Sequence, residues 1–217
     1  MIKKGAIFDK DGILFDTQKD FCEGWKLAGQ YFGKVVDQSF LVEMAGSNKW
    51  QAAKIIETYY PDVDPWKMRD IMLKYVEYQQ QHFLTTKPGV PEILKYLKKQ
   101  KMPIALASGG TSDMIVNNLK QGKIDFYFDA VVAGTDVKKA KPEPDIFILA
   151  AKKLNLDPKD CYVFEDSPKG LQAGREAGCF TVMIPDCFED TPELKDIHDT
   201  VCKDFFEVRD RMEKGLL

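Results

Sequence analysis

The sequence predicts an α/β protein: a Rossmann-like, doubly wound parallel sheet core with an α-helical cap domain inserted near its start. Short apolar runs of strand length alternate with helical patterns in the second half of the chain, an order that builds parallel sheets with crossover helices. Residues 16–86 instead carry helical patterns without a clear strand. The length of 217 residues suits one large domain with a modest insert. We therefore expect residues 1–15 and 87–217 to form the core and residues 16–86 to form the cap.

The expected elements follow from local signals. Proline or a hydroxyl residue marks the start of each expected core helix, because proline fits the first turn and a hydroxyl group caps it. These start signals are Pro91, Thr111 or Ser112, Pro144, and Ser167 with Pro168. The helix from Ser167 is expected to end near Gly178 and to pack closely on the sheet through glycines spaced four residues apart. The expected strands are 5–8, 104–107, 130–133, 162–164 and 180–184.

Composition excludes several classes of function. A net charge of -3 and a pI near 5.5 argue against nucleic-acid binding, which usually needs a basic excess. The five cysteines form no Cys-x-x-Cys pair, so neither a disulfide framework nor a zinc knuckle is indicated. No apolar run has the length of a signal peptide or a membrane span, and we expect a cytoplasmic protein without membrane contact. With only two histidines, any metal is expected to use oxygen ligands.

Polar and reactive residues follow four of the expected strands. In open α/β sheets, ligands bind beyond the carboxyl ends of the strands, so these residues should meet at one edge. Each motif alone has an ordinary explanation, such as a solvated turn, surface charge or a helix cap. Together they place like charges close enough to repel unless a cation neutralises them. The residues are Asp9 and Asp11 after the first strand, Ser108 and Gly109 after the second, Lys141 after the third, and Glu165 with Asp166 after the fourth.

The residue types at this edge suit a phosphoryl group and Mg²⁺. The carboxylates of Asp9, Asp166 and Glu165 are hard oxygen ligands, and Mg²⁺ binds through a few carboxylates together with substrate phosphate. A calcium EF-hand does not fit, because Gly12 falls at the fourth loop position instead of the sixth. Ser108 with the glycine amides after it can cradle an anion at a helix start, and Lys141 adds a point charge.

Four segments resemble the ordered motifs of the haloacid dehalogenase superfamily, in its phosphatase and β-phosphoglucomutase-like branch with an α-helical cap. They are residues 8–17 (FDKDGILFDT), Ser108, residues 141–145 (KPEPD) and residues 164–167 (FEDS). The resemblance covers essentially the whole chain.

The resemblance implies a role for each motif residue. Asp9 would be the nucleophile that forms an aspartyl-phosphate, and Asp11 would protonate the leaving alcohol and later activate water. Asp9, Asp166 and the backbone carbonyl of Asp11 would hold Mg²⁺. Glu165 would assist as a ligand or through bound water. The phosphoryl oxygens would be held by Ser108, Gly109 and Lys141.

The cap is expected to choose the substrate, because a closing lid presents side chains to the leaving group. Two features depart from the mutases of this branch. Phe21 stands where they carry a histidine, and Lys49 is the residue nearest to their phosphate-gripping arginine. The tryptophan and tyrosine residues of the segment can equally form the core of the cap. The candidate specificity residues are Gly46, Ser47, Asn48, Lys49 and Trp50.

We therefore predict a Mg²⁺-dependent phosphatase that hydrolyses a small phosphomonoester, such as a sugar phosphate. The alternative is a β-phosphoglucomutase-like hexose phosphomutase. Two other classes stay open: a phospho-acceptor receiver domain, which would not need a cap, and a binding module that keeps the fold without catalysis. The expected partner is a small phosphorylated metabolite, with the chain a monomer or weak oligomer.

Overall fold

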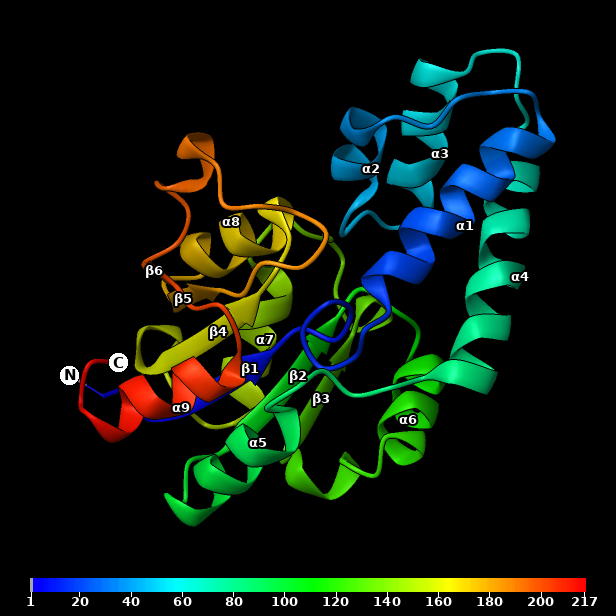
Figure 1. Ribbon diagram of the computed structural model, residues 1–217. Coiled ribbons are helices and arrows are strands. Elements are labelled where there is room, and N and C mark those ends of the chain that lie inside the picture. Colours follow the sequence, from blue (N-terminus) through cyan, green and yellow to red (C-terminus); the bar gives the residue numbers. More distant parts are fainter. Residues whose placement is uncertain (1) are drawn as a thin grey trace.

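The computed structural model describes residues 2–217, and a parallel sheet of six strands lies at its centre (Figure 1). The strand order is β3-β2-β1-β4-β5-β6, so the chain enters in the middle of the sheet and winds outward in both directions. This topology confirms the predicted doubly wound fold. The strands are β1 (Gly5–Phe8), β2 (Ile104–Ser108), β3 (Ala130–Ala133), β4 (Cys161–Glu165), β5 (Phe180–Met183) and β6 (Thr200–Val201).

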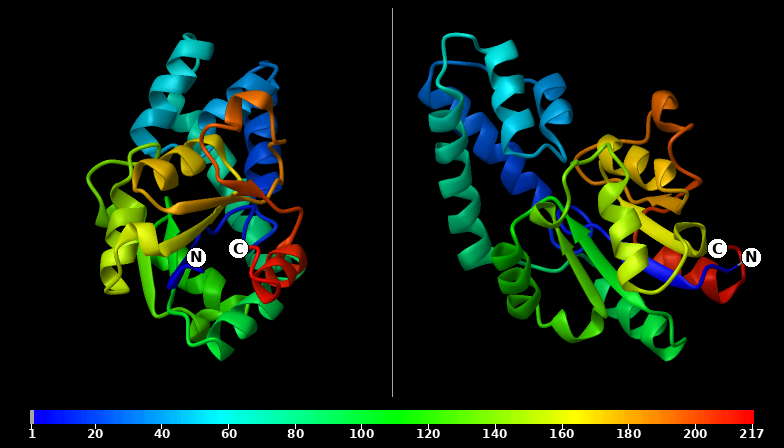
Figure 2. Two further views of the ribbon diagram at one scale, coloured as in Figure 1. Left: turned by 90° about the vertical axis from the view of Figure 1, so that its left-hand side faces the viewer. Right: turned by 180° about the vertical axis from the view of Figure 1, so that it is seen from behind.

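Helices cover both faces of the sheet (Figure 2). One face packs against α5 (Val90–Lys99), α6 (Ser112–Gln121) and α9 (Phe205–Glu213). The other face packs against α7 (Asp145–Lys153) and α8 (Pro168–Glu176). Short 3-10 turns complete the connections at Asp125–Tyr127, Gly134–Asp136, Pro158–Asp160 and Pro192–Leu194.

The strand sequences determine which side chains meet which layer. Successive side chains of a strand point to opposite faces. Ala6 and Phe8 therefore join the apolar cluster under α5 and α9, while Ile7 between them joins the cluster under α7 and α8. Both clusters are fully buried here, which explains why the strands read as continuous apolar runs instead of alternating ones.

Four helices form a separate group beyond the carboxyl ends of the strands, which we call the cap: α1 (Gln18–Tyr31), α2 (Gln38–Met44), α3 (Lys49–Tyr59) and α4 (Pro65–Phe83). The cap has an apolar cluster of its own, with Trp25 and Phe40 in edge-to-face contact at 5.7 Å between ring centroids. Its helices begin at side-chain caps such as Asp64, whose carboxylate accepts from Trp66 N at 2.9 Å.

The chain passes between sheet and cap along two adjacent segments. Asp16 N donates to Thr85 O at 3.1 Å, and Lys87 N donates to Leu14 O at 2.9 Å. Phe15 and Thr86 form an antiparallel bridge between these bonds. The predicted boundaries at residues 15 and 87 fall in this two-stranded ribbon.

The sequence signals placed the starts of the core helices to within about one residue. The elements after β5, namely β6 and α9, were not predicted. Ser167 caps α8 by accepting from Gly170 N at 3.2 Å, and α7 begins directly after Pro144. The sequence did not reveal β6, because two residues cannot display a strand pattern. Within residues 2–217, no helix is both long enough and apolar enough to span a bilayer.

Candidate active site

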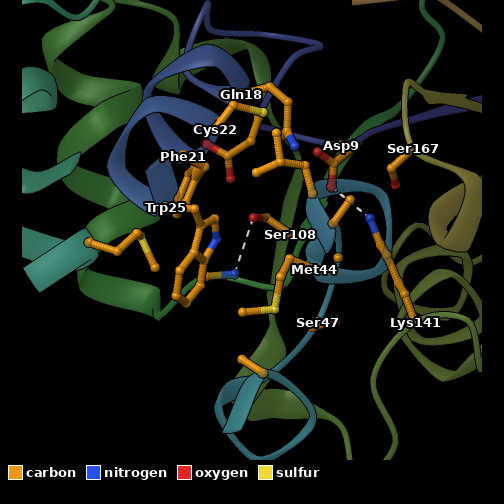
Figure 3. Close-up of a pocket in the computed structure, with 18 of the residues that line it drawn as sticks. Asp9, Gln18, Phe21, Cys22, Trp25, Met44, Ser47, Ser108, Lys141 and Ser167 are labelled. Atoms are coloured by element: carbon orange, nitrogen blue, oxygen red, sulfur yellow. Dashed lines mark hydrogen bonds and ion pairs between the residues drawn. The ribbon is translucent and has the colours of Figure 1, made fainter. Parts of the chain in front are cut away.

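A cavity of about 200 Å³ lies between the carboxyl end of the sheet and the cap. Figure 3 shows Asp9 and Lys141 on one side of it and the α1 side chains Gln18, Phe21 and Trp25 on another. The core residues predicted from strand ends all line this cavity: Asp9, Asp11, Ser108, Gly109, Lys141, Glu165 and Asp166.

Lys141 links two carboxylates in the buried part of the cavity. Its Nζ lies 2.6 Å from Asp9 Oδ1 and 2.5 Å from Glu165 Oε1, and all three side chains are at least nine-tenths buried. Burial alone would lower the pKa of Lys141, but the carboxylates of Asp9 and Glu165 raise it above its usual range. Lys141 therefore stays protonated and supplies a fixed positive charge beside Asp9.

Glu165 is held by the start of α8 and positions Lys141. Its Oε2 accepts from the backbone amides of Asp166 and Ser167, both at 2.9 Å, and from Ser167 Oγ at 3.0 Å. Its Oε1 accepts from Lys141. The sequence left open whether Glu165 would bind a metal directly or through water, and here both of its carboxylate oxygens accept hydrogen bonds from the protein. Gly170 makes the arrangement possible, since a Cβ there would lie 1.8 Å from Oε1.

Asp11 lies where the core chain turns toward the cap. Its Oδ1 accepts from Lys10 Nζ at 2.5 Å and from Thr17 Oγ1 at 2.6 Å. Lys10 is fully buried, a rare state for lysine unless it is paired. Thr17 precedes α1, so the carboxylate of Asp11 is bonded to the segment that connects sheet and cap. Neither Lys10 nor Thr17 was assigned a role from the sequence.

The surrounding protein only partly compensates the negative charge that the carboxylates of Asp9 and Asp166 carry when ionised. Burial raises the pKa of Asp9 to about 7, with Glu165 and Asp11 acting in the same direction and Lys141 acting against them. Burial likewise raises the pKa of Asp166 well above its usual range, reinforced by Glu165 and Asp9. Asp166 Oδ2 is buried without a hydrogen-bond partner. A buried acceptor of this kind normally has a partner, so the group suits a bound cation.

The carboxylate oxygens around Asp166 suit a magnesium ion whose remaining coordination positions are filled by water and substrate. Among the described residues, no three Asp, Glu, His or Cys side chains are gathered closely enough to hold a metal. Mg²⁺ commonly binds through one or two carboxylates, with water and substrate phosphate completing the octahedron. Gly12 leaves space beside Asp166, because a Cβ at Gly12 would lie 2.3 Å from Oδ2. The ligands expected from the resemblance, Asp9, Asp166 and the backbone carbonyl of Asp11, would suit such a site.

Ser108 and the glycines after it form an open turn at the end of β2. Ser108 is almost fully buried, and its Oγ accepts from Gly110 N at 3.2 Å. No atom outside the adjacent residues lies within 4 Å of the position a Cβ would take at Gly109, so the turn leaves room on that side. Thr111 then caps α6, accepting from Met114 N at 3.5 Å. Hydroxyl and amide groups beside open space can hold an anion.

The cap contributes an arginine that sequence reasoning missed. Arg69 of α4 lines the cavity and shares its helix face with Met72 and Leu73 at i+3 and i+4. Within residues 2–217, no carboxylate lies within ion-pair distance of its guanidinium, and burial lowers the pKa of Arg69. A charged residue on the apolar face of an amphipathic helix was the available signal. Arg69 gives the cap side of the cavity a positive charge.

Only two of the five predicted cap residues reach the cavity. Gly46 and Ser47 line it. Asn48 instead caps α3, accepting from Trp50 N and Gln51 N at 2.9 Å. Trp50 is 65% exposed, stacks edge-to-face on Trp66 at 5.2 Å, and carries Lys49 over its ring. Asn48, Lys49 and Trp50 therefore do not line the cavity in this structure, because they lie at the start of α3 and not in the loop before it.

A lysine of the core holds the cap loop in place. Lys169 of α8 donates to Ser47 Oγ at 2.7 Å and to the backbone carbonyl of Glu43. Burial lowers the pKa of Lys169. Gly46, at φ +68°, lies directly above, where an added Cβ would be 3.6 Å from Lys169 Cβ and 3.8 Å from Lys141 Cβ. The cap loop thus rests on the side of the cavity that carries Lys141.

Comparison with known proteins gives the family. A family model described as haloacid dehalogenase-like hydrolase matches residues 6–184. The chain belongs to the haloacid dehalogenase-like hydrolases. This confirms the resemblance seen in the sequence and the prediction of a hydrolase.

Named relatives match more than four-fifths of the length of this hydrolase. It is 33% identical over 181 residues to the fructose-1-phosphate phosphatase YqaB of Escherichia coli (strain K12), covering 83% of this chain and 95% of the relative. It is 29% identical to the β-phosphoglucomutase of Bacillus subtilis (strain 168), covering 83% of each. The crystal structure of a hydrolase from Pseudomonas syringae superposes with a TM-score of 0.84 at 24% identity, covering 98% of this chain and 99% of that one. The last comparison confirms the fold.

Proposed function

We propose that this hydrolase is a Mg²⁺-dependent phosphatase that removes the phosphoryl group of a small phosphorylated sugar through Asp9. The observation that carries the proposal is the buried Asp9 carboxylate at 2.6 Å from Lys141, in a cavity that also holds Asp11, Ser108 and the unpartnered oxygen of Asp166. The Escherichia coli relative, named a fructose-1-phosphate phosphatase, supports a sugar phosphate as substrate.

The chemistry proposed for Asp9 is displacement at phosphorus. A carboxylate oxygen of Asp9 forms a bond to phosphorus while the bond to the sugar oxygen breaks, and Asp11 gives a proton to that oxygen. In the second step Asp11 takes a proton from water, whose oxygen attacks phosphorus and releases Asp9. Lys141 and Ser108 hold the phosphoryl oxygens through both steps, and this positioning and charge stabilisation dominate phosphoryl transfer.

The proposed magnesium site consists of Asp9, Asp166 and the backbone carbonyl of Asp11. When bound, Mg²⁺ would neutralise the negative charge of the two carboxylates and the phosphoryl group. Glu165 acts next to this site by orienting Lys141, since its two oxygens are already bonded.

The cap residues proposed to contact the leaving sugar are Arg69, Gln18 and Ser47. All three line the cavity and carry polar groups suited to hydroxyl oxygens. Of the five cap residues predicted from the sequence, Gly46 and Ser47 are the two that line the cavity and could contact the substrate.

The second candidate is the phosphomutase, which would return the phosphoryl group to substrate instead of water. The Bacillus subtilis relative named β-phosphoglucomutase favours it. Against it, Phe21 lines the cavity at the position where the mutases of this branch carry a histidine. Product analysis separates the two, because a mutase yields an isomeric sugar phosphate and a phosphatase yields inorganic phosphate.

The test measures phosphate release from hexose 1- and 6-phosphates, glycerol phosphate and a nucleotide, with Mg²⁺ or with chelator. We expect release that needs Mg²⁺ and falls on the order of 10³-fold in Asp9→Asn. Asp113→Asn, which changes an exposed acid in the first turn of α6, is the matched control and should retain the wild-type rate. Full activity of Asp9→Asn, or wild-type activity in chelator, would contradict the proposal.

We propose a cytoplasmic protein that acts on a free phosphorylated metabolite, without nucleic-acid or membrane partners, as a monomer or weak oligomer. Size-exclusion chromatography with light scattering tests the last point.

A further inference from the structure

Two thiols meet where the cap touches the core. Cys22 lies on α1, belongs to the apolar cluster of the cap and also lines the cavity. Cys187 lies in the loop after β5 and packs against the same apolar cluster. The two thiol groups lie close enough to interact with each other, and Cys187 Sγ donates to Asp186 Oδ2 at 3.8 Å. Two residues 165 positions apart in the sequence thus place sulfur atoms side by side, one from each part of the molecule.

The environments of these thiols differ from those of the other cysteines. The interaction with Cys187 lowers the pKa of Cys22, and Lys26 acts in the same direction. The interaction with Cys22 and burial raise the pKa of Cys187, and Asp186 acts in the same direction, so Cys187 keeps its proton. The remaining thiols are buried in the core, where burial raises the pKa of Cys161 and Cys202 to about 11 and that of Cys179 to about 12.

We propose that Cys22 and Cys187 form a reversible disulfide in response to peroxide and that this bond fixes the cap to the core. The Cys22 thiolate attacks one oxygen of hydrogen peroxide, the O–O bond breaks, hydroxide leaves and Cys22 becomes a sulfenic acid. The Cys187 sulfur then attacks the Cys22 sulfur. The S–S bond forms as the S–O bond breaks, and the hydroxyl group leaves as water with the proton of Cys187.

The loop that carries Cys187 is itself anchored to the core. Lys87, at the end of the ribbon joining sheet and cap, forms an ion pair with Asp186, the residue before Cys187. The disulfide would therefore tie α1 to a fixed point. The contact of Lys169 with Ser47 can open and close by exchanging hydrogen bonds with water, whereas a disulfide cannot. Since lids commonly must open for product release, oxidation is expected to slow turnover.

The expected loss of phosphate release on oxidation rests on the proposed phosphatase function, whereas formation of the disulfide does not.

To test the disulfide, wild-type protein is treated with dilute hydrogen peroxide, quenched with a thiol-blocking reagent, digested without reductant and mapped by mass spectrometry. We expect a linked Cys22–Cys187 peptide lacking two hydrogens. Phosphate release should fall at least tenfold in the oxidised protein and recover with dithiothreitol.

Cys187→Ser is the diagnostic variant, since Cys187 is outside the cavity lining. It should show wild-type basal release, form no linked peptide and give a dimedone adduct on Cys22 after peroxide. Cys202→Ser, a buried core cysteine, should oxidise as the wild type does. Absence of the linked peptide would overturn the inference, as would a complete cross-link that leaves phosphate release unchanged. If reduced protein releases no phosphate from any substrate, the proposed function fails and peptide mapping still decides the disulfide.

Discussion

Replacing Asp9 with asparagine should stabilise the metal-free protein more at pH 8 than at pH 5. The pKa of Asp9 rises from 3.8 to about 7 on folding, mainly through burial. Between these values the folded protein holds a proton that the unfolded chain has lost, so wild-type stability falls as pH rises toward 7. Asparagine stays neutral throughout and removes this dependence.

The expected size follows from the same pKa. Each unit of pH between the two pKa values changes the free energy of unfolding by about 1.4 kcal/mol per proton. From pH 5 to the folded pKa near 7 is about two units, so the advantage of Asp9→Asn should grow by about 3 kcal/mol between pH 5 and pH 8. Above pH 7 the advantage should stay constant.

Urea unfolding in chelator at pH 5, 6, 7 and 8 measures this difference, with Asp113→Asn as the exposed control. Repeating the pH 8 series with Mg²⁺ should shrink the advantage of Asp9→Asn, because the ion stabilises the ionised wild-type site. An advantage that is equal at pH 5 and pH 8 in chelator would refute the reasoning about buried charge.

Three further substitutions test other contacts of the site. Gly170→Ala would put a Cβ 1.8 Å from Glu165 Oε1, and we expect a loss of about 1–3 kcal/mol in urea unfolding together with lower activity; unchanged stability would mean that Glu165 is not held as described. Arg69→Ala should raise KM for the preferred sugar phosphate about tenfold, or about 1.4 kcal/mol, with kcat altered much less; an unchanged KM would remove Arg69 from the substrate contacts. Lys169→Met should lose the bond to Ser47 and speed amide exchange in the cap loop at unchanged global stability, whereas unaltered exchange would show that other contacts hold the loop.

The core of the candidate site was predictable because sheet geometry brings strand ends together. Asp9, Ser108 and Asp166 each directly follow or end a buried strand, and parallel strands place those positions at one edge. Lys141 lies in a longer loop after β3, and it too lines the cavity at this edge. For these residues, a position in the sequence translates almost directly into a position in space.

The cap was less predictable because helix packing, not strand order, decides which side chains face the cavity. Trp50 follows the cap loop in sequence, yet α3 turns it toward Trp66. Arg69 lies 20 residues beyond Lys49, and α4 returns it to the cavity. The contact of Lys169 with the cap loop could not be predicted for another reason. Its partners are a hydroxyl group and a backbone carbonyl, and neither produces a recognisable sequence pattern.

The paired bonds Asp16–Thr85 and Lys87–Leu14 have a consequence for how such proteins diversify. Because the two ends of the intervening segment lie next to each other, the whole segment is an interchangeable module. It can be lengthened, shortened or exchanged for another without altering the path of the chain through the sheet. A graft of the corresponding segment from a relative should therefore carry that relative's substrate preference onto the catalytic residues of this one.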